Sequence, residues 1–160
     1  MSVVTNYGLK VDTNETLATD VDASANPTIS HTDFSSSESL SATSTVPVTV
    51  CSYETVALTA GAYTIDLTAL NGTNGIAVDG TNLKVQLFKI KNLGDDPMTF
   101  TEGAATGYLL KGSGWKTILA KEQEELFYGN DLTPDVTALL KHIDVAGTGT
   151  ETFELSVVLG

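Results

Sequence analysis

The stretch LKVQLFKIKNLGDDPMTF, residues 83–100, decides the fold class of this chain. Apolar Val85 and Leu87 alternate with polar Lys84 and Gln86, and a Gly-Asp-Asp-Pro corner then ends the pattern. Alternation with a period of two is typical of a half-buried strand, and a proline beside acidic residues favours a turn. The stretch therefore predicts a strand, a turn and the start of a returning strand.

Similar short alternating segments recur from residue 46 onwards. We expect strands at residues 46–59, 63–70, 108–111, 115–119, 126–131, 142–147 and 152–160. Residues 118–126 also fit a helical pattern, but the short run and its β-type neighbours favour a strand, a turn and a strand. Two Asn-Gly pairs and one Asp-Gly within residues 71–82 predict a long loop with a short strand inside it. Short strands separated by regular turn signals are typical of an all-β sandwich or barrel.

One short helix is expected in a crossover loop, at residues 133–142. Thr133 can cap it, Pro134 suits the first helical position, and Asp135 favours the positive end of the helix dipole. The following apolar residues have the spacing of one helical face, and they are Val136, Leu139, Leu140 and Ile143.

The first 45 residues differ in composition from the rest, which divides the chain into an acidic, Ser/Thr-rich N-terminal arm (1–45) and a β-sandwich domain (46–160). An arm with so few bulky apolar residues cannot offset its own ordering entropy, so it is either disordered or extended over something else. Short strands are possible at residues 27–34 and 40–43.

Four apolar residues near the start of the arm are candidate contacts with a partner. They are Val3, Val4, Tyr7 and Leu9. Because the arm has no core of its own, these side chains must be buried on another surface or remain exposed. Another subunit is one such surface.

The charge of the chain restricts its partners. The formal net charge is −12, all eight basic residues are lysines, and residues 1–66 contain one lysine against eight acids. Nucleic-acid binding needs clustered basic residues and prefers arginine, so we expect no nucleic-acid partner. An acidic surface repels anionic membranes and is attracted to a basic surface on a protein.

No targeting segment or membrane span is expected. The N-terminal residues have no basic region followed by an apolar one, and no window approaches the ~20 apolar residues of a membrane-spanning helix. Synthesis in the cytoplasm is the default expectation.

The sequence shows no catalytic motif, so we expect a protein that is not an enzyme. A nucleophilic Cys51 would need a histidine, and neither His31 nor His142 is near it in sequence, which leaves proximity in space open. Ser113 lacks the glycine two positions before it that a nucleophile elbow requires, because Lys111 is there.

We also expect no metal or other cofactor. A single cysteine excludes a multi-cysteine zinc site. The segment DVDASAN, residues 20–26, offers oxygen ligands spaced as in a calcium loop, but Ala25 replaces the required glycine and His31 replaces the final glutamate. A solvated loop explains this segment better.

The order of turns and strands over residues 63–160 resembles small virion structural proteins of tailed bacteriophages, of the head-decoration or cement kind. The segments that carry the resemblance are NGTNG, KIKNLG, LFYGND and GTGTETFEL, and the arm lies outside it. The resemblance implies a jelly-roll-like β-sandwich with no catalytic residue.

The resemblance also implies a function. Such a protein coats the outer surface of a capsid, as trimers or dimers bound to the shell of major capsid protein, and helps the shell withstand internal DNA pressure. We therefore expect a homo-oligomer located on the virion and made in the host cytoplasm.

Two other classes of function stay open. A tail, fibre or receptor- and glycan-binding β-module would be favoured by an exposed aromatic platform around Trp115. An enzyme would need Cys51 or Ser113 within hydrogen-bonding distance of a histidine. Other binding proteins, including bacterial adhesive β-modules, are a further alternative.

Overall fold

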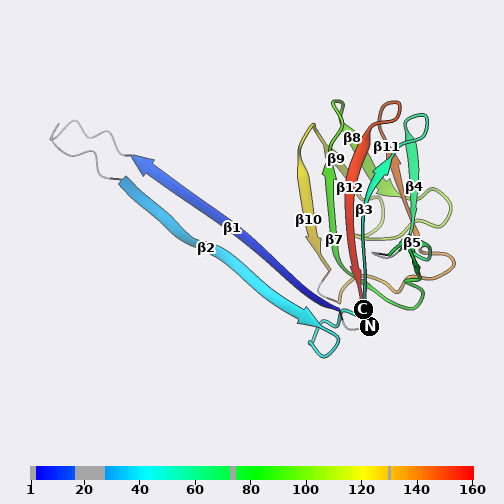
Figure 1. The fold of residues 1–160 in the computed structure, drawn as a ribbon, viewed down its shortest axis with the longest axis horizontal. Coiled ribbons are helices and arrows are strands. Elements are labelled where there is room, and N and C mark those ends of the chain that lie inside the picture. Colours follow the sequence, from blue (N-terminus) through cyan, green and yellow to red (C-terminus); the bar gives the residue numbers. More distant parts are fainter. Residues whose placement is uncertain (1–2, 17–27, 73–74, 130) are drawn as a thin grey trace.

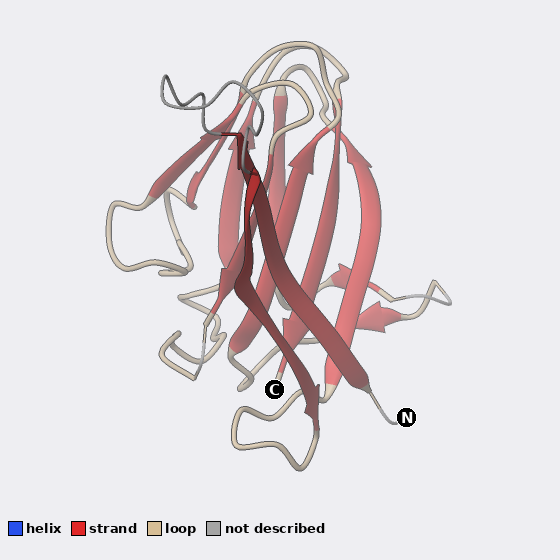
Figure 2. Cartoon of the chain, turned by 90° about the vertical axis from the view of Figure 1, so that its left-hand side faces the viewer, coloured by secondary structure: helices blue, strands red, loops and turns tan. Residues whose placement is uncertain are grey.

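The structure of the protein is a computed structural model that describes residues 3–16, 28–72, 75–129 and 131–160. Within these ranges the chain is all-β and contains no helix (Figure 2). Two four-stranded sheets face each other, and a long two-stranded ribbon projects from one end of them (Figure 1). The prediction of an all-β sandwich is therefore confirmed.

All strand pairs are antiparallel. The first sheet has the order β10-β7-β12-β3, with β3 (Val50–Ala57), β7 (Val85–Asn92), β10 (Glu124–Tyr128) and β12 (Thr152–Leu159). The second has the order β4-β11-β8-β9, with β4 (Ala62–Asp66), β8 (Met98–Glu102), β9 (Lys116–Leu119) and β11 (His142–Ala146). A small pair, β5 (Leu70–Asn71) and β6 (Ala77–Val78), lies within the long loop that the Asn-Gly pairs predict.

The stretch at residues 83–100 carries the chain from one sheet to the other. It forms β7 in the first sheet and β8 in the second, so the corner between them connects interior strands of the two sheets. Side chains from outside the Gly-Asp-Asp-Pro sequence cap this corner. Asn92 Oδ1 accepts a hydrogen bond from Gly94 N (2.8 Å), and Glu151 Oε1 accepts one from Asp95 N (2.8 Å).

The core lies between the two sheets and consists of the inward positions of every long strand. Phe100 from the second sheet packs edge-on against Phe153 from the first, with ring centroids 5.4 Å apart. Ile90, Ile143 and Leu155 are also buried in this cluster. Full burial of each such side chain contributes roughly 1.5–3 kcal/mol of stability, so the alternation visible in the sequence is also the main source of stability.

The prediction of a helix at residues 133–142 is wrong. Val136 N donates to Leu83 O (2.8 Å) and Val136 O accepts from Asn82 N (2.9 Å), so this segment pairs with the chain before β7. Thr133 does not cap a helix but donates its hydroxyl to Val85 O (2.9 Å). Leu139, placed on the buried face of the helix by its spacing, is 74% exposed. Tertiary hydrogen bonds override the local capping signals here.

Residues 108–111 lie in a loop and do not form the predicted strand, and Tyr108 and Leu110 of this loop pack in the core. Tyr108 is fully buried, donates its hydroxyl to Pro134 O (2.7 Å) and accepts a hydrogen bond from Val85 N (3.2 Å). Trp115 Nε1 donates to Tyr108 O (2.8 Å). These bonds connect the loop between β8 and β9 and the loop between β10 and β11 to the start of β7.

The N-terminal residues form a long hairpin ribbon of two strands, β1 (Val4–Thr16) and β2 (Thr28–Ser41). The register runs from Val4 opposite Ser41 to Thr16 opposite Thr28, with one irregularity between Val11 and Thr13. β2 is continuous where the sequence suggests two short strands. Figure 1 shows the ribbon projecting away from the sandwich, and Figure 2 shows it from its own side, in front of the sheets. The domain boundary at residue 45 stays a prediction.

Candidate functional site

The root of the ribbon is held on the outer face of the first sheet by a second apolar cluster. Its buried members are Val3, Leu40, Val46, Val48, Leu87 and Val158, and Tyr7, Cys51 and Tyr128 pack against them. The ribbon, the loop that follows it and the sheet all contribute residues. The cluster therefore fixes the direction in which the ribbon leaves the sandwich.

Tyr7 makes the most specific contacts at this root. Its ring lies 5.0 Å from that of Tyr128, at an interplanar angle of 36°. Its hydroxyl donates to Glu38 Oε2 (2.8 Å), which connects β1 to β2. Partial burial and the neighbouring Glu38 carboxylate raise the pKa of Tyr7 above its usual value. The phenol therefore stays neutral and keeps its hydrogen bond over the physiological pH range.

The structure places the four candidate contact residues in different environments. Val3 is buried in the second cluster, and Tyr7 packs on Tyr128 of the same chain. Val4 is 60% exposed. Leu9 lies in β1, and its side chain is outside the described part of the structure. Contact of these residues with a partner stays a prediction.

A crevice opens where the ribbon separates from the sheet. It has a volume of about 320 Å³. Its lining residues are Thr5, Asn6, Tyr7, Gly8, Leu87, Lys89, Glu124, Leu126, Ser156 and Val158. Lys89 Nζ and Glu124 Oε2 form an ion pair (3.0 Å) across β7 and β10, and Leu126 is 40% exposed beside it. One wall of this crevice is the ribbon.

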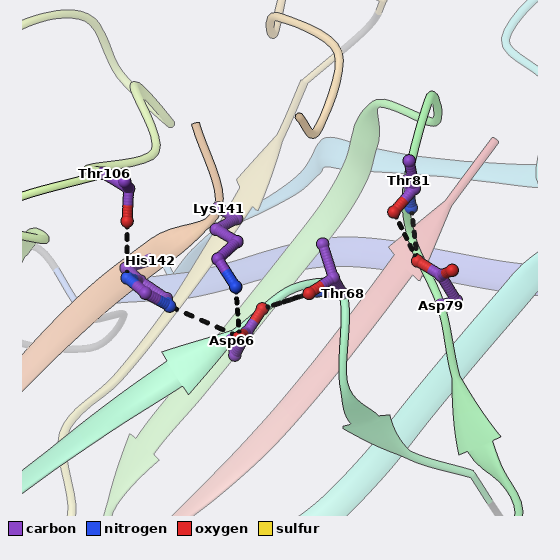
Figure 3. Close-up of polar contacts among 7 residues, drawn as sticks. All are labelled: Asp66, Thr68, Asp79, Thr81, Thr106, Lys141 and His142. Carbon is purple, nitrogen blue, oxygen red and sulfur yellow. Dashed lines mark hydrogen bonds and ion pairs between the residues drawn. The ribbon is translucent and has the colours of Figure 1, made fainter. Parts of the chain in front are cut away.

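A second concentration of polar side chains surrounds Asp66 at the end of β4 (Figure 3). Lys141 Nζ lies 2.7 Å from Asp66 Oδ2, and His142 Nε2 lies 3.3 Å from the same oxygen. Asp66 Oδ1 accepts hydrogen bonds from the amide (2.9 Å) and the hydroxyl (2.6 Å) of Thr68. Burial alone would raise the pKa of Asp66, but the donors outweigh burial and hold that pKa well below its usual range.

Thr106, His142 and Asp66 form a chain of hydroxyl, imidazole and carboxylate. Thr106 Oγ1 and His142 Nδ1 are 2.6 Å apart, and the other ring nitrogen faces Asp66. Nucleophilic catalysis would use such an imidazole to take the proton of the hydroxyl. A hollow in the surface beside Asp66 is lined by Thr68, Asp79, Thr81, Ala138 and Lys141. Neither Thr106 nor His142 lines it.

Asp79 makes the same turn as Asp66, because its Oδ1 accepts hydrogen bonds from the amide and the hydroxyl of Thr81 (Figure 3).

The Asp66 cluster connects segments that are distant in sequence. Thr106 comes from the loop after β8, Lys141 and His142 from the start of β11, and Thr68 from the turn after β4. The side chain of His142 contacts Thr106 and Asp66. Neither Cys51, which packs in the second apolar cluster, nor Ser113 has a hydrogen bond to His142 among the described residues. The side chain of His31 lies outside the described part.

Trp115 does not provide the exposed aromatic platform that would favour a tail, fibre or glycan-binding module. Trp115 is 7% exposed, its indole N–H donates to Tyr108 O, and Lys111 Nζ lies 5.8 Å from its ring centroid. Lys111 also forms an ion pair with Glu125. An open apolar hollow of about 630 Å³ lies beside this pair, lined by Leu109, Leu110, Lys111, Gly112, Phe127, Leu132, Thr133 and Pro134.

Sequence reasoning missed both the ribbon and the Asp66 cluster. Tyr7, Leu9 and Val11 alternate with Gly8 and Lys10, which is the signal for β1 that the high polar content of the arm obscured. The two Asp-x-Thr sequences at residues 66–68 and 79–81 indicated paired turns. No local signal placed Lys141 and His142 beside Asp66.

The described ranges contain neither a metal-binding cluster nor a membrane-spanning helix. No group of three or more His, Cys, Asp or Glu side chains in them is arranged to hold a metal ion. The calcium-like segment at residues 20–26 lies outside these ranges. The described residues form no helix that is long and apolar enough to cross a membrane.

Comparison with known proteins gives no further guidance, because no family model, curated protein or solved structure matches this sequence.

Proposed function

We propose that this chain is a non-enzymatic virion structural protein that binds the outer surface of a phage capsid and stabilises it. The observation that carries the proposal is the β1–β2 ribbon, which leaves the sandwich in a direction fixed by the cluster at its root (Figure 1). A projection whose root is packed on the sandwich loses less conformational entropy on contact with a neighbouring surface than a free arm would lose.

The charge of the chain supports a protein surface as the partner. The net charge is −12, and a basic patch on a shell would attract such a surface and orient it during encounter. The same charge disfavours nucleic acid and anionic lipid. The major capsid protein shell is therefore the partner that we propose.

The order of strands supports the finer fold expected from the resemblance, a jelly roll. From β3 to β12 the long strands alternate between the sheets, except that β8 and β9 are neighbours in the second sheet. Eight strands in two sheets of four, connected in this order, are consistent with the jelly-roll arrangement found in many capsid domains. This arrangement is part of the proposal.

The test is sedimentation of the full chain with shells assembled from the major capsid protein of the same genome. The proposal expects saturable binding to assembled shells and little binding to free shell subunits. Tyr7→Ala loosens the ribbon root and is expected to lower binding at least several-fold. Tyr53→Ala is the matched control, because Tyr53 is 63% exposed on β3 and belongs to neither apolar cluster. Equal binding to shells and free subunits, or none to shells, would refute the proposal.

The alternative, a tail, fibre or receptor- and glycan-binding module, has less support. It expects an exposed aromatic platform at Trp115, and that side chain is buried beneath Lys111. Binding of the chain to purified tails or to an array of cell-surface glycans, with no binding to shells, would favour this alternative.

A further inference from the structure

The outer edge of β2 is an unpaired strand edge. β2 pairs with β1 on one side only, and the ribbon projects clear of the sandwich (Figures 1 and 2). Among the described residues, no backbone group of residues 28–40 has a hydrogen bond outside the ribbon. At the root, Ser41 O accepts from Ser44 N and Val48 N, which ends the free edge.

The outer edge of β1 differs from that of β2, because β1 carries Lys10 and its root lies against the first sheet across the crevice. The edge strands of the sandwich are short or protected. β9 has four residues and includes Lys116, and β10 has five and begins with Glu124 and Glu125. The edge of β3 is partly covered, because Ser52 Oγ donates to Asn71 O (2.6 Å). Charged residues, short length and covering loops are the usual devices that prevent strands from pairing between molecules.

β2 lacks most of these devices. Its 14 residues include no lysine, arginine or proline, and Ser36, Ser37, Glu38 and Ser39 are all exposed. The irregularity opposite Val11–Thr13 is the one feature that interrupts the edge. A two-stranded hairpin is also marginally stable in water, so an additional strand on this edge would stabilise it.

We infer that β2 pairs with β2 of a second copy of this chain, antiparallel and tip to root, to form a four-stranded sheet between two sandwiches. Antiparallel pairing of a strand with itself gives a two-fold interface, the most common symmetry of homo-oligomers. Full overlap of Thr28–Ser41 places Thr28 opposite Ser41 of the second copy. This inference does not depend on the proposed binding to shells.

The sequence of β2 fits this self-pairing. Full overlap sets Ile29 opposite Leu40, Ser30 opposite Ser39 and His31 opposite Glu38 of the second copy, and each pair occurs twice by symmetry. No two acids are opposed, whereas opposed like charges would destabilise the pair. With two acids in 14 residues, the edge has too little charge to select a basic foreign strand instead.

The geometry also limits the repulsion between two acidic sandwiches. A strand of 14 residues at roughly 3.3 Å per residue is about 45 Å long, and tip-to-root pairing places one sandwich at each end. Repulsion over that distance is screened, because the Debye length is about 8 Å at physiological ionic strength. If the pairing were centred nearer the root, the first residues of β2 in the second copy would lie beyond Ser41, where the loop after β2 begins (Figure 1).

Sedimentation equilibrium and cysteine cross-linking of the full chain test this inference. The expected mass is twice the 16.8 kDa of the monomer, with dissociation on dilution. In a Cys51→Ala background, Ser30→Cys with Ser39→Cys is expected to form a disulfide-linked dimer on mild oxidation, because directly opposed residues lie within the Cα separation of a disulfide. Within one chain, Ser30 is opposite Asn14 and Ser39 is opposite Asn6, so no internal disulfide competes.

The matched control carries Ser37→Cys with Ser39→Cys, which are directly opposed only if the two strands pair root to root, since residues 34–41 form a regular strand. A dimer in which the first variant cross-links and the control does not supports the inference. A monomer at every concentration overturns it, as does a dimer that cross-links in neither variant, equally in both, or only in the control. Since shells are absent from this experiment, its failure leaves the proposed capsid binding untouched.

Discussion

The ionised side chain of Asp66 connects the turn after β4 to Lys141 and His142 through an ion pair and hydrogen bonds. Asp66→Asn removes the ion pair with Lys141 while keeping the shape of the side chain, and both side chains are less than a third exposed. We expect a loss of about 1–2 kcal/mol in the free energy of unfolding, measured by urea denaturation. Asp79→Asn is the matched control, since Asp79 makes the same turn with Thr81 but is fully exposed and should cost less. Equal losses would mean that the turn, and not the ion pair, matters.

The pH dependence of stability should follow the same carboxylate. Because the folded protein lowers the pKa of Asp66 below that of the unfolded chain, its contribution is complete above the unfolded value of about 3.9 and is lost as the pH falls towards the folded value. The difference in unfolding free energy between the wild type and Asp66→Asn should therefore be constant near neutral pH and shrink below about pH 4. A difference that grows on acidification would show that Asp66 is not held ionised by its donors.

Tyr108 should be sensitive to the loss of one oxygen atom. Tyr108→Phe leaves Val85 N and Pro134 O without their partner in a buried position. Unsatisfied buried polar groups cost about 1–3 kcal/mol, so thermal unfolding should shift down by several degrees. Tyr53→Phe removes the hydroxyl of a side chain that is 63% exposed and should leave the unfolding temperature unchanged.

At the scale of elements, the ribbon and the sandwich should differ in stability. Tyr7→Ala removes the contact with Tyr128 and the hydrogen bond to Glu38. We expect faster amide hydrogen exchange in β1 and β2 and unchanged exchange in β7 and β12, because the root cluster holds the ribbon on the sandwich. Faster exchange throughout the sandwich would show that the ribbon and the core unfold together.

Elements with apolar alternation were predictable, and elements that depend on distant partners were not. β7 and β12 each carry apolar residues two positions apart over most of their length, and this spacing located both of them even though it breaks at Leu87–Phe88 and at residues 157–159. The Gly-Asp-Asp-Pro corner located the crossing between the sheets. The predicted helix failed because Val136 pairs with Leu83, a contact that no local pattern encodes. The ribbon was missed because its strands are polar, and pairing with each other, not burial, orders them.

The candidate site residues also divide into those that the sequence indicates and those that depend on strand pairing. Val3 and Tyr7 were identified because an apolar side chain in a polar arm needs a surface, but that surface proved to be the chain's own sheet. Asp66, Lys141 and His142 come together only because β4 and β11 are paired, with His142 opposite Asp66. Register between strands distant in sequence cannot be derived from composition or periodicity.

At the scale of the whole molecule, the proposed function makes a thermodynamic prediction about shells. A protein that binds the intact shell but not its dissociated subunits stabilises the shell by RT ln(1 + [L]/Kd) per site, about 2.7 kcal/mol when its concentration is 100 times Kd. The temperature at which empty shells disassemble should therefore rise as the chain is added and keep rising after all sites are filled. Tyr7→Ala should need a higher concentration for the same rise, and Tyr53→Ala should match the wild type. A disassembly temperature that does not change at saturation would show that the chain binds subunits as tightly as shells, so that it decorates the capsid without stabilising it.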